Sequence, residues 1–220
     1  MIMQKYFWLE RWAREETGFH EGAVNAYLNQ FWRSMNLSDD CSVFVPLCGK
    51  SVDMQWLREQ GHPVIGVELS SIAVQAFFKE NNYITQHETR IKFDLYEAND
   101  IRILCGDFFD LVREDLAGVT AVYDRASMVA LPPEMRERYV EHLAKILPSG
   151  AKILLVAFDY PQSEMQGPPF AVSSAEVEKL YSRYADISVL AQVDALPQNP
   201  RFQKNGLTRL NENIFALTLR

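Results

Sequence analysis

Short apolar runs alternate along the chain with longer segments in which apolar residues recur at helical spacing. A strand-length run between turn residues is typical of a buried strand, and a period of about 3.6 residues is typical of a helix. The alternating order predicts an α/β fold with a mostly parallel sheet and helices on both faces. The expected strands are residues 43–45, 63–68, 101–104, 120–123, 152–157, 187–195 and 213–219, the last two as an antiparallel hairpin.

Helices are expected between these strands and ahead of the first one. Residues 6–36 predict two helices, and Phe7, Trp8 and Trp12 form an aromatic stripe in the first of them. Such a stripe is more often packing than a ligand site. The other expected helices are residues 51–57, 70–81, 132–147 and a last one that begins at a capping box at Ser173.

Three segments lack a helical period. Residues 82–100 are less regular, but residues 92–96 alternate and residues 97–100 are typical of a turn, which predicts a hairpin that runs into the strand at 101–104. Residues 159–170 are expected to form a loop at the carboxyl edge of the sheet, where ligands bind in open α/β folds. Residues 197–206 are expected to form a polar loop.

Composition limits the possible partners. The chain has 220 residues, 48% of them hydrophobic, and no repeat or linker divides it, so we expect one domain over residues 1–220. The formal net charge is −7 and no run of Lys or Arg is present, so no nucleic acid partner is expected. A small-molecule ligand is favoured.

The cysteine and histidine positions give no sign of a metal site. Cys41, Cys48 and Cys105 lack the paired spacing of a zinc site, and the four histidines are scattered. We therefore expect no metal, and reduced thiols in a cytoplasmic protein. The longest apolar run, residues 153–158, is too short to cross a bilayer and no signal peptide is recognisable, so a soluble protein without a membrane partner is expected.

The turn after the first strand has the features of a ligand site. The strand stops at Pro46, and Ser51 is the expected N-cap of the next helix. The first N–H groups of a helix have no partner inside it, so they bind anionic or carboxylate groups. Leu47 and Gly49 are the expected ligand contacts in the turn, since glycine permits a close approach.

Two phosphate-binding motifs fit this turn poorly. A P-loop requires G-x-x-x-x-G-K-[ST], and Gly49-Lys50-Ser51 supplies only its end because Phe44 stands where the first glycine belongs. The dinucleotide motif requires three glycines, of which only Gly49 is present. The turn is therefore not suited to a diphosphate.

The second strand ends in Glu68, nineteen residues after Gly49. In doubly wound sheets an acid about twenty residues past the glycine turn accepts hydrogen bonds from ribose hydroxyls. The alternative is that Glu68 only interacts with the dipole of the helix that follows. A ribose acid beside a turn without diphosphate-binding glycines indicates an adenosine ligand that lacks phosphate, and S-adenosylmethionine is the common one.

Four segments of the sequence resemble the thiopurine S-methyltransferase family. They are residues 45–51 (V-P-L-C-G-K-S), 61–68, 123–125 and 167–170, and the resemblance runs from about Trp8 to the C-terminus. It implies a Rossmann-like S-adenosylmethionine-dependent methyltransferase fold, with a mostly parallel seven-stranded sheet and an antiparallel C-terminal hairpin strand. Residues 1–36 are then expected to form a helical cover over the cofactor site.

The resemblance also assigns residues to the two ligands. It implies that Trp12 contacts the cofactor, that Phe19 borders the substrate pocket and that Arg125 lies at the active site. Arg201 resembles a substrate-side arginine of the vertebrate members, in a loop that is longer here. Arg125 stays protonated, so it is expected to orient an anionic substrate rather than to act as a base. Pairing with Asp124 at the sheet rim is the structural alternative.

An acid also follows the third parallel strand. Methyltransferases of the Rossmann-like class often place an acid there to accept from the adenine amino group, with an apolar neighbour against the ring. Asp107 and Phe108 occupy these positions and are the expected adenine contacts, in addition to Arg125 on the cofactor side. The alternative is that Asp107 caps the helix that follows.

Methyl transfer from a sulfonium has a neutral leaving group, so alignment and exclusion of water are the main requirements. A thiol or selenol of low pKa arrives as the anion, so no side-chain base is required. We expect a monomeric enzyme that methylates small aromatic or heterocyclic thiols, and selenium or tellurium compounds because bacterial members of the family are associated with them. The alternatives are a P-loop-like kinase or NTPase and a non-catalytic small-molecule binding protein of the same fold.

Overall fold

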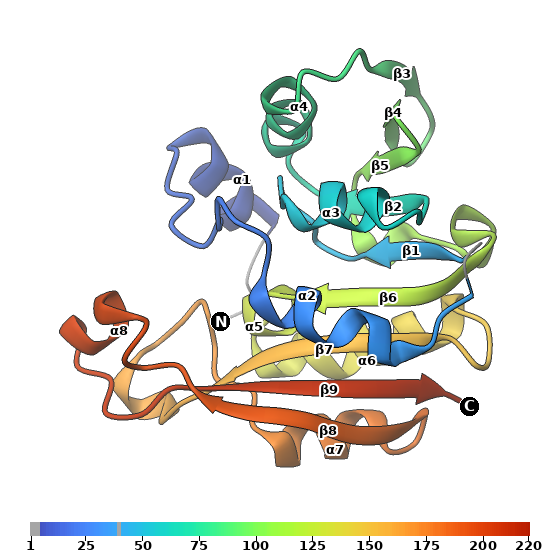
Figure 1. The fold of residues 1–220 in the computed structure, drawn as a ribbon. Helices are drawn as coiled ribbons and strands as arrows, with labels where there is room; N and C mark the ends of the chain where they lie inside the picture. The colour runs from blue at the N-terminus through green and yellow to red at the C-terminus, as the bar shows by residue number, and fades with distance from the viewer. Residues whose placement is uncertain (1–4, 39–40) are drawn as a thin grey trace. The chain divides into compact units, whose positions relative to one another are not determined.

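The computed structural model describes residues 5–38 and 41–220. These residues form two compact units, one that ends at Tyr123 and one that runs from Asp124 to Arg220 (Figure 1).

A parallel sheet is the centre of the first unit. β1 pairs with β2 and with β6, and β2 also pairs with β5, all in parallel, with Val43 opposite Val64 and Val64 opposite Ile101. β1 and β2 are almost entirely buried, as expected for strands that read as continuous apolar runs. The predicted parallel strands of this unit are confirmed. They are β1 (Ser42–Val45), β2 (Val64–Glu68), β5 (Ile101–Cys105) and β6 (Val119–Arg125), whose last two residues belong to the second unit.

Two helices connect the first three of these strands. They are α3 (Asp53–Glu59), which follows β1, and α4 (Ser71–Glu80), which follows β2. The expected cap at Ser51 is not the N-cap, because α3 begins only at Asp53, but the Ser51 hydroxyl accepts the Asp53 N–H at 3.2 Å. Ser70 caps α4 by accepting the Ala73 N–H at 3.4 Å.

An antiparallel hairpin extends the sheet beyond β5. It consists of β3 (Gln86–Thr89) and β4 (Asp94–Ala98), and β4 pairs with β5. The hairpin expected to run from residues 92–96 into the strand at 101–104 is confirmed by the antiparallel pairing of β4 with β5, whereas β3 was not predicted. The predicted seven-stranded, mostly parallel sheet is wrong in detail, since the described residues contain nine strands and several of their pairs are antiparallel. All four residues of β3 are exposed, so the strand has no buried face that an apolar pattern could reveal.

The N-terminal segment contains the two expected helices, and the second is shorter than predicted. α1 (Lys5–Ala13) is followed by an irregular stretch, and α2 (Ala26–Phe31) continues into the 3₁₀ turn η1 (Trp32–Met35). Asn25 caps α2 by accepting the N–H groups of Tyr27 and Leu28. Two further 3₁₀ turns, η2 (Phe108–Asp110) and η3 (Arg113–Leu116), lie between β5 and β6.

In the second unit β9 (Asn211–Leu219) lies between β7 (Lys152–Asp159) and β8 (Ala185–Asp194). It pairs with both in antiparallel register (Figure 1). This confirms the antiparallel C-terminal hairpin. The elements are α5 (Ser127–Ala130), α6 (Pro133–Ile146), β7 (Lys152–Asp159), η4 (Gln162–Glu164), α7 (Ser174–Tyr181), β8 (Ala185–Asp194), α8 (Pro200–Lys204) and β9 (Asn211–Leu219).

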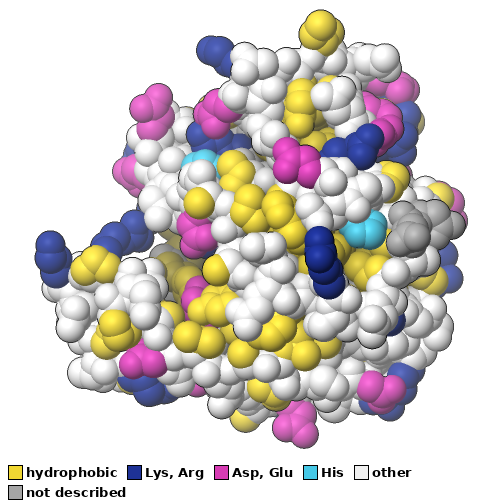
Figure 2. All heavy atoms as spheres, viewed as in Figure 1, with side chains coloured by type: hydrophobic (Ala, Val, Ile, Leu, Met, Phe, Trp, Pro, Cys, Tyr) yellow, Lys and Arg dark blue, Asp and Glu magenta, His cyan; other side chains and the backbone are white. Residues whose placement is uncertain are grey.

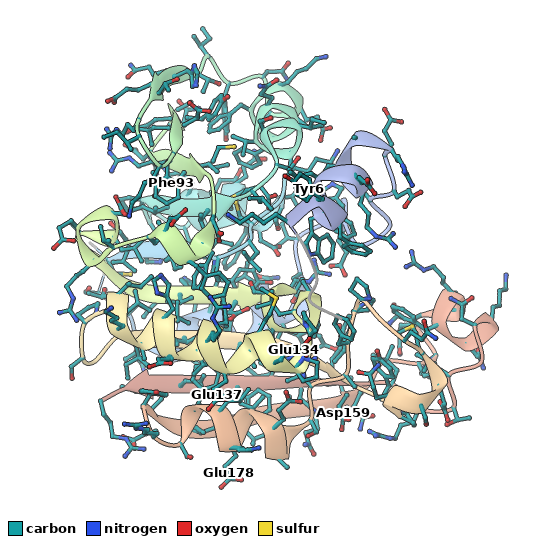
Figure 3. The ribbon with its side chains drawn as sticks, turned by 180° about the vertical axis from the view of Figure 1, so that it is seen from behind. Tyr6, Phe93, Glu134, Glu137, Asp159 and Glu178 are labelled. Atoms are coloured by element: carbon teal, nitrogen blue, oxygen red, sulfur yellow. The ribbon has the colours of Figure 1, made fainter. Side chains whose placement is uncertain are left out.

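The helices of the second unit are amphipathic. Glu134 and Glu137 on α6 and Glu178 on α7 are exposed (Figure 3), whereas Tyr139 and Tyr181 on the same helices are fully buried. Ser173 accepts the Glu176 N–H at 3.2 Å and is the predicted N-cap of α7, while Oε1 of Glu176 lies 2.6 Å from Nη1 of Arg136.

The polar loop expected at residues 197–206 is instead partly helical, because Pro200 stands at the first turn of α8. Phe202 anchors α8 in a small apolar cluster with Tyr160 and Leu210. The single apolar side chain in a polar stretch carries no periodic signal, and this explains the wrong prediction.

Surface charge is dispersed on the face drawn in Figure 2, where Lys and Arg side chains lie apart from one another. Within the described part of the chain, no helix has the length and apolar character that a membrane span requires. Over the same residues, no group of three or more His, Cys, Asp or Glu side chains comes together as a metal site.

Candidate functional site

The carboxylate of Glu68 joins the end of β2 to the turn that follows β1. Its Oε2 accepts a hydrogen bond from the Gly49 N–H at 2.9 Å, and its Oε1 accepts from the Ser70 N–H at 2.8 Å. The residue is 6% exposed. The parallel pairing of β1 with β2 therefore brings the predicted ribose acid directly against the glycine turn.

Glu68 retains capacity for one more donor. Burial raises its pKa above the ordinary value, and hydrogen bonds from the N–H groups of Ser70, Gly49 and Leu69 oppose that shift. An ionised carboxylate has about four acceptor sites, so three N–H contacts leave room for a hydroxyl. The remaining acceptor site of this carboxylate fits a ribose hydroxyl of an adenosine-type cofactor.

The turn itself is held in an unusual backbone conformation. Leu47 has φ of 46° and Gly49 has φ of 52°, both in the left-handed region. A non-glycine residue with positive φ costs about 1–3 kcal/mol, and such residues concentrate at ligand sites. Leu47 and Gly49, the two residues predicted as contacts, are half-buried, as are Lys50 and Ser51, whereas Cys48 is buried.

Cys48 packs beneath the turn and is not a reactive thiol. A Cβ on Gly66 would lie 2.7 Å from the Cys48 sulfur, so glycine at this position of β2 makes room for the side chain. Burial raises the pKa of the Cys48 thiol well above its ordinary value, and the nearby Glu68 carboxylate adds to the effect. Cys48 therefore stays protonated and serves packing.

Trp12 brings α1 onto the glycine turn. A Cβ added to Gly49 would lie 3.2 Å from the Cζ2 atom of Trp12, and Trp12 is 6% exposed. Its ring packs edge to face against Phe19, with centroids 5.4 Å apart, and Phe19 packs in the same way against Trp8. The aromatic stripe is thus a packed cluster, as the structural alternative expected, and it also lies at the predicted cofactor turn.

Asp107 both caps a turn and pairs with α1. Its Oδ1 accepts the Phe109 N–H at 3.0 Å, which confirms the capping alternative, and its Oδ2 lies 2.6 Å from the Lys5 ammonium. Phe108 is 3% exposed and its ring stacks on Phe44, with centroids 6.5 Å apart. Phe108 therefore packs into the core, and the adenine contacts at Asp107 and Phe108 stay predictions.

Arg125 and Arg201 belong to the second unit. Arg125 is the last residue of β6 and is half-buried, while Arg201 is exposed on α8 with its guanidinium 5.6 Å from the centroid of the Phe202 ring. Asp124, fully buried beside Arg125, accepts the hydroxyl of Tyr139 at 2.6 Å. Burial raises the pKa of Asp124 to about 6.

The sequence did not reveal the role of Asp53. This carboxylate is 2% exposed, accepts the Asn25 N–H at 2.8 Å with Oδ1 and accepts the Tyr123 hydroxyl at 3.0 Å with Oδ2. It thereby ties the start of α2 and the end of β6 to the turn after β1. Its position in the first turn of α3 is visible in the sequence, but its two partners are 28 and 70 residues away.

Comparisons with known proteins identify the family of this chain. The family model described as thiopurine S-methyltransferase matches residues 3–220. A thiopurine S-methyltransferase of Nitrosospira multiformis is 58% identical over 218 residues, which cover 99% of each chain. One from Pseudomonas fluorescens strain SBW25 is 48% identical over 219 residues, with 99% of this chain and 100% of the relative covered.

Solved structures show the same fold at low identity. A 1,6-didemethyltoxoflavin-N1-methyltransferase of Burkholderia thailandensis, with bound S-adenosylhomocysteine, has a TM-score of 0.63 at 12% identity and covers 98% of this chain and 87% of its own. A phosphoethanolamine N-methyltransferase of Haemonchus contortus, in complex with S-adenosyl-L-methionine, has a TM-score of 0.64 at 9% identity. The match covers 87% of this chain and 52% of that longer protein.

These comparisons confirm the predicted Rossmann-like methyltransferase fold and do not support a P-loop-like kinase or a non-catalytic binding protein. The residue patterns that suggested the resemblance lie within the matched range. Because the family model matches nearly the whole chain and a named member is 58% identical to it, the chain belongs to the thiopurine S-methyltransferase family.

Proposed function

We propose that this protein transfers the methyl group of S-adenosylmethionine to the sulfur of small aromatic or heterocyclic thiols. The observation that carries the proposal is the buried Glu68 carboxylate, which lies at the end of β2, hydrogen-bonded to the glycine turn and with acceptor capacity to spare. Relatives that are named thiopurine S-methyltransferases support sulfur as the acceptor atom.

Most of the residues that hold the cofactor in this proposal belong to the first unit. Glu68 accepts from the ribose, Leu47 and Gly49 border the ligand from the turn, and Trp12 covers it from α1. Asp107 and Phe108 serve the adenine end, and Arg125 contributes from the end of β6. S-adenosylmethionine supplies an electrophilic methyl group on a sulfonium whose departure leaves a neutral thioether.

The acceptor side requires orientation rather than a base. An aromatic thiol of low pKa is largely ionised at neutral pH, so the protein has only to align it and to exclude water. Phe19 borders the acceptor, and Arg125 and Arg201 attract its negative charge. Selenium and tellurium compounds are further acceptors in this proposal, since a selenol or tellurol, like a thiol, ionises to a soft nucleophilic anion.

The proposal extends to the whole protein. We propose a monomer in the cytoplasm, with residues 1–220 as one methyltransferase domain and residues 1–36 as its N-terminal cover. The contacts of α1 with the turn support the cover within the described residues, since Trp12 lies on Gly49 and Lys5 pairs with Asp107. Residues 1–4 of that segment lie outside the described residues.

A transfer assay with matched acceptors tests the proposal. Purified protein is incubated with methyl-labelled S-adenosylmethionine and 6-mercaptopurine, with 6-hydroxypurine as the oxygen control and selenite as a separate arm. We expect label in the methylthio product and none in the control. Binding of the cofactor without transfer to any thiol, or binding of ATP with magnesium in its place, contradicts the proposal.

A further inference from the structure

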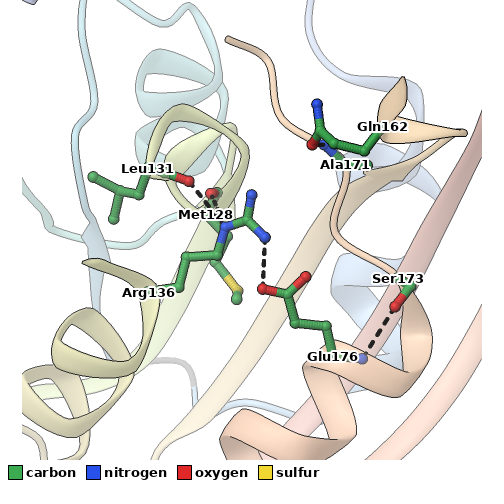
Figure 4. Close-up of polar contacts among 7 residues, drawn as sticks. All are labelled: Met128, Leu131, Arg136, Gln162, Ala171, Ser173 and Glu176. Atoms are coloured by element: carbon green, nitrogen blue, oxygen red, sulfur yellow. Dashed lines mark hydrogen bonds and ion pairs between the residues drawn. The ribbon is translucent and has the colours of Figure 1, made fainter. Parts of the chain in front are cut away.

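Arg136 on α6 is a fully buried cation at the point where two loops of the second unit meet. The first loop, residues 126–132, follows β6 and contains α5, and the second, residues 160–171, follows β7. Its side chain has 0% exposure. Nε donates to the carbonyl oxygens of Leu131 at 2.9 Å and Met128 at 3.2 Å, and Nη1 lies 2.6 Å from Oε1 of Glu176 (Figure 4). The guanidinium therefore caps the carbonyl end of α5 and ties it to α7.

The second loop, residues 160–171, is joined to the same place. The Phe170 N–H donates to the carbonyl oxygen of Val129 in α5 at 2.7 Å, and the Arg136 guanidinium lies 5.9 Å from the centroid of the Phe170 ring. A Cβ on Gly167 would lie 2.5 Å from that ring, so the glycine makes room for Phe170. Phe170 is thus held from both sides.

Internal hydrogen bonds make this loop compact. The Tyr160 hydroxyl donates to the Pro169 carbonyl oxygen at 2.6 Å, and Gln162 accepts the Ala171 N–H at 2.9 Å. Gln162 also donates to the Met165 carbonyl oxygen at 2.6 Å. With these bonds in place, fixing Phe170 against Arg136 fixes the loop as a whole.

Stability alone does not account for a buried guanidinium. Removing a charge from water costs several kcal/mol unless it is fully paired. Among the residues the structure describes, Nη2 of Arg136 has no hydrogen-bond partner. An apolar residue of similar volume avoids that cost, which indicates that the guanidinium serves the geometry of the loops.

The two loops lie where ligands bind in open α/β folds. One follows the carboxyl end of β6 directly after Arg125, and the other follows the carboxyl end of β7. The positions of the residues on the acceptor side therefore depend on how these two loops are held.

We infer that Arg136 is a positioning residue for the methyl acceptor. By fixing α5 and residues 160–171 to each other, it holds the rim formed by Phe170 in the arrangement that receives the thiol. This inference rests on the proposed function and adds to it a residue that does not touch the reacting atoms.

Conservative substitution separates positioning from stability. Arg136→Lys keeps the charge but loses the fork that bonds two carbonyls and Glu176 at once. We expect the KM for the thiol to rise about tenfold or more, since small misplacements cost up to about a hundredfold in rate. The Kd for S-adenosylhomocysteine, measured by calorimetry, is expected to change less than about twofold. Arg138→Lys, an exposed position on the same helix, is the matched control and is expected to change neither value.

The outcomes distinguish this inference from the proposed function. An unchanged KM in Arg136→Lys, or equal rises of KM and of the cofactor Kd together with a lower Tm, overturns the inference alone. If Arg136→Lys does not fold, Glu176→Gln is tested instead, because it removes the ion pair and keeps an acceptor for Arg136. A raised KM for the thiol with an unchanged cofactor Kd supports positioning. An unchanged KM for the thiol overturns it. Absence of transfer by the wild type overturns the proposed function instead.

Discussion

Gly49 meets two constraints at once. Its φ of 52° favours glycine, and its missing Cβ leaves room for Trp12, whose Cζ2 atom would be 3.2 Å from that Cβ. The backbone conformation is a local property, so the tight turn at Gly49 could be predicted from the sequence. The indole that packs on it comes from a different helix and could not.

Gly49→Ala is therefore expected to lower both stability and cofactor affinity. The positive φ alone costs about 1–2 kcal/mol with a Cβ present, and displacement of Trp12 adds a loss of affinity for S-adenosylhomocysteine. Gly150→Ala is the matched control, since Gly150 has φ of 82° and nothing within 4 Å of an added Cβ. We expect both variants to have a lower Tm in calorimetry, and only Gly49→Ala to have a raised Kd. Equal Kd values for both variants would show that the Trp12 contact does not matter for binding.

Asp124 makes stability depend on pH in a defined direction. Its pKa is raised from 3.8 to about 6, chiefly by burial, while hydrogen bonds from Tyr139 and Ser127 oppose the shift. Tyr181, whose own pKa is raised partly by Asp124, packs near it. The unfolded chain loses this proton first as pH rises from about 4 to 6, so the folded state loses stability over that window.

Asp124→Asn is expected to remove this pH dependence. Relative to the wild type, the free energy of unfolding of the variant should rise by about 2 kcal/mol between about pH 4 and pH 7, because the amide does not ionise. Urea unfolding at several pH values measures the difference, and any constant cost of the substitution cancels. A difference that does not vary with pH contradicts the raised pKa.

At the scale of elements, α1 is attached to the rest of the first unit at two points. Trp12 lies on the glycine turn, and Lys5 reaches Asp107 after β5 at 2.6 Å. Asp107 raises the pKa of Lys5 by this contact. The ion pair holds the first turn of the proposed cover over the cofactor residues.

Lys5→Gln is expected to weaken cofactor binding modestly. Lys5 is 60% exposed at its side chain, and exposed ion pairs contribute about 0.2–1 kcal/mol, so the Kd for S-adenosylhomocysteine should rise about two- to fivefold. The wild-type Kd should also rise with salt, because exposed pairs are screened. Arg14→Gln, which removes an exposed pair with Glu10 at 3.8 Å, is the control. An increase of the same size in the control would mean that the Lys5–Asp107 pair has no special role.

The elements that sequence patterns missed are those without a buried face. β3 is exposed along its length, so only its pairing with β4 makes it a strand. α8 has a single buried side chain, Phe202. By contrast, β1 and β2 are nearly continuous apolar runs, and their positions and parallel pairing followed from the pattern.

At the scale of the whole molecule, the order of strands and helices predicted an α/β fold, and the resemblance to the family implied its Rossmann-like form. The approach of Glu68 to Gly49 follows from that order, because parallel neighbours bring their carboxyl ends to one edge. The ties made by Asp53 and by Arg136 join residues far apart in the sequence, and no local pattern specifies such partners. Sequence reasoning therefore predicted an acid beside the glycine turn as the cofactor ligand, but it did not predict the groups that hold the loops.

The most direct test of the account is a crystal structure of the complex with S-adenosylhomocysteine. We predict that the ribose hydroxyls donate to the Glu68 carboxylate, with the turn at Leu47 and Gly49 alongside and Trp12 over the ligand. A nucleoside bound elsewhere, with Glu68 bonded only to the backbone, would contradict the central claim.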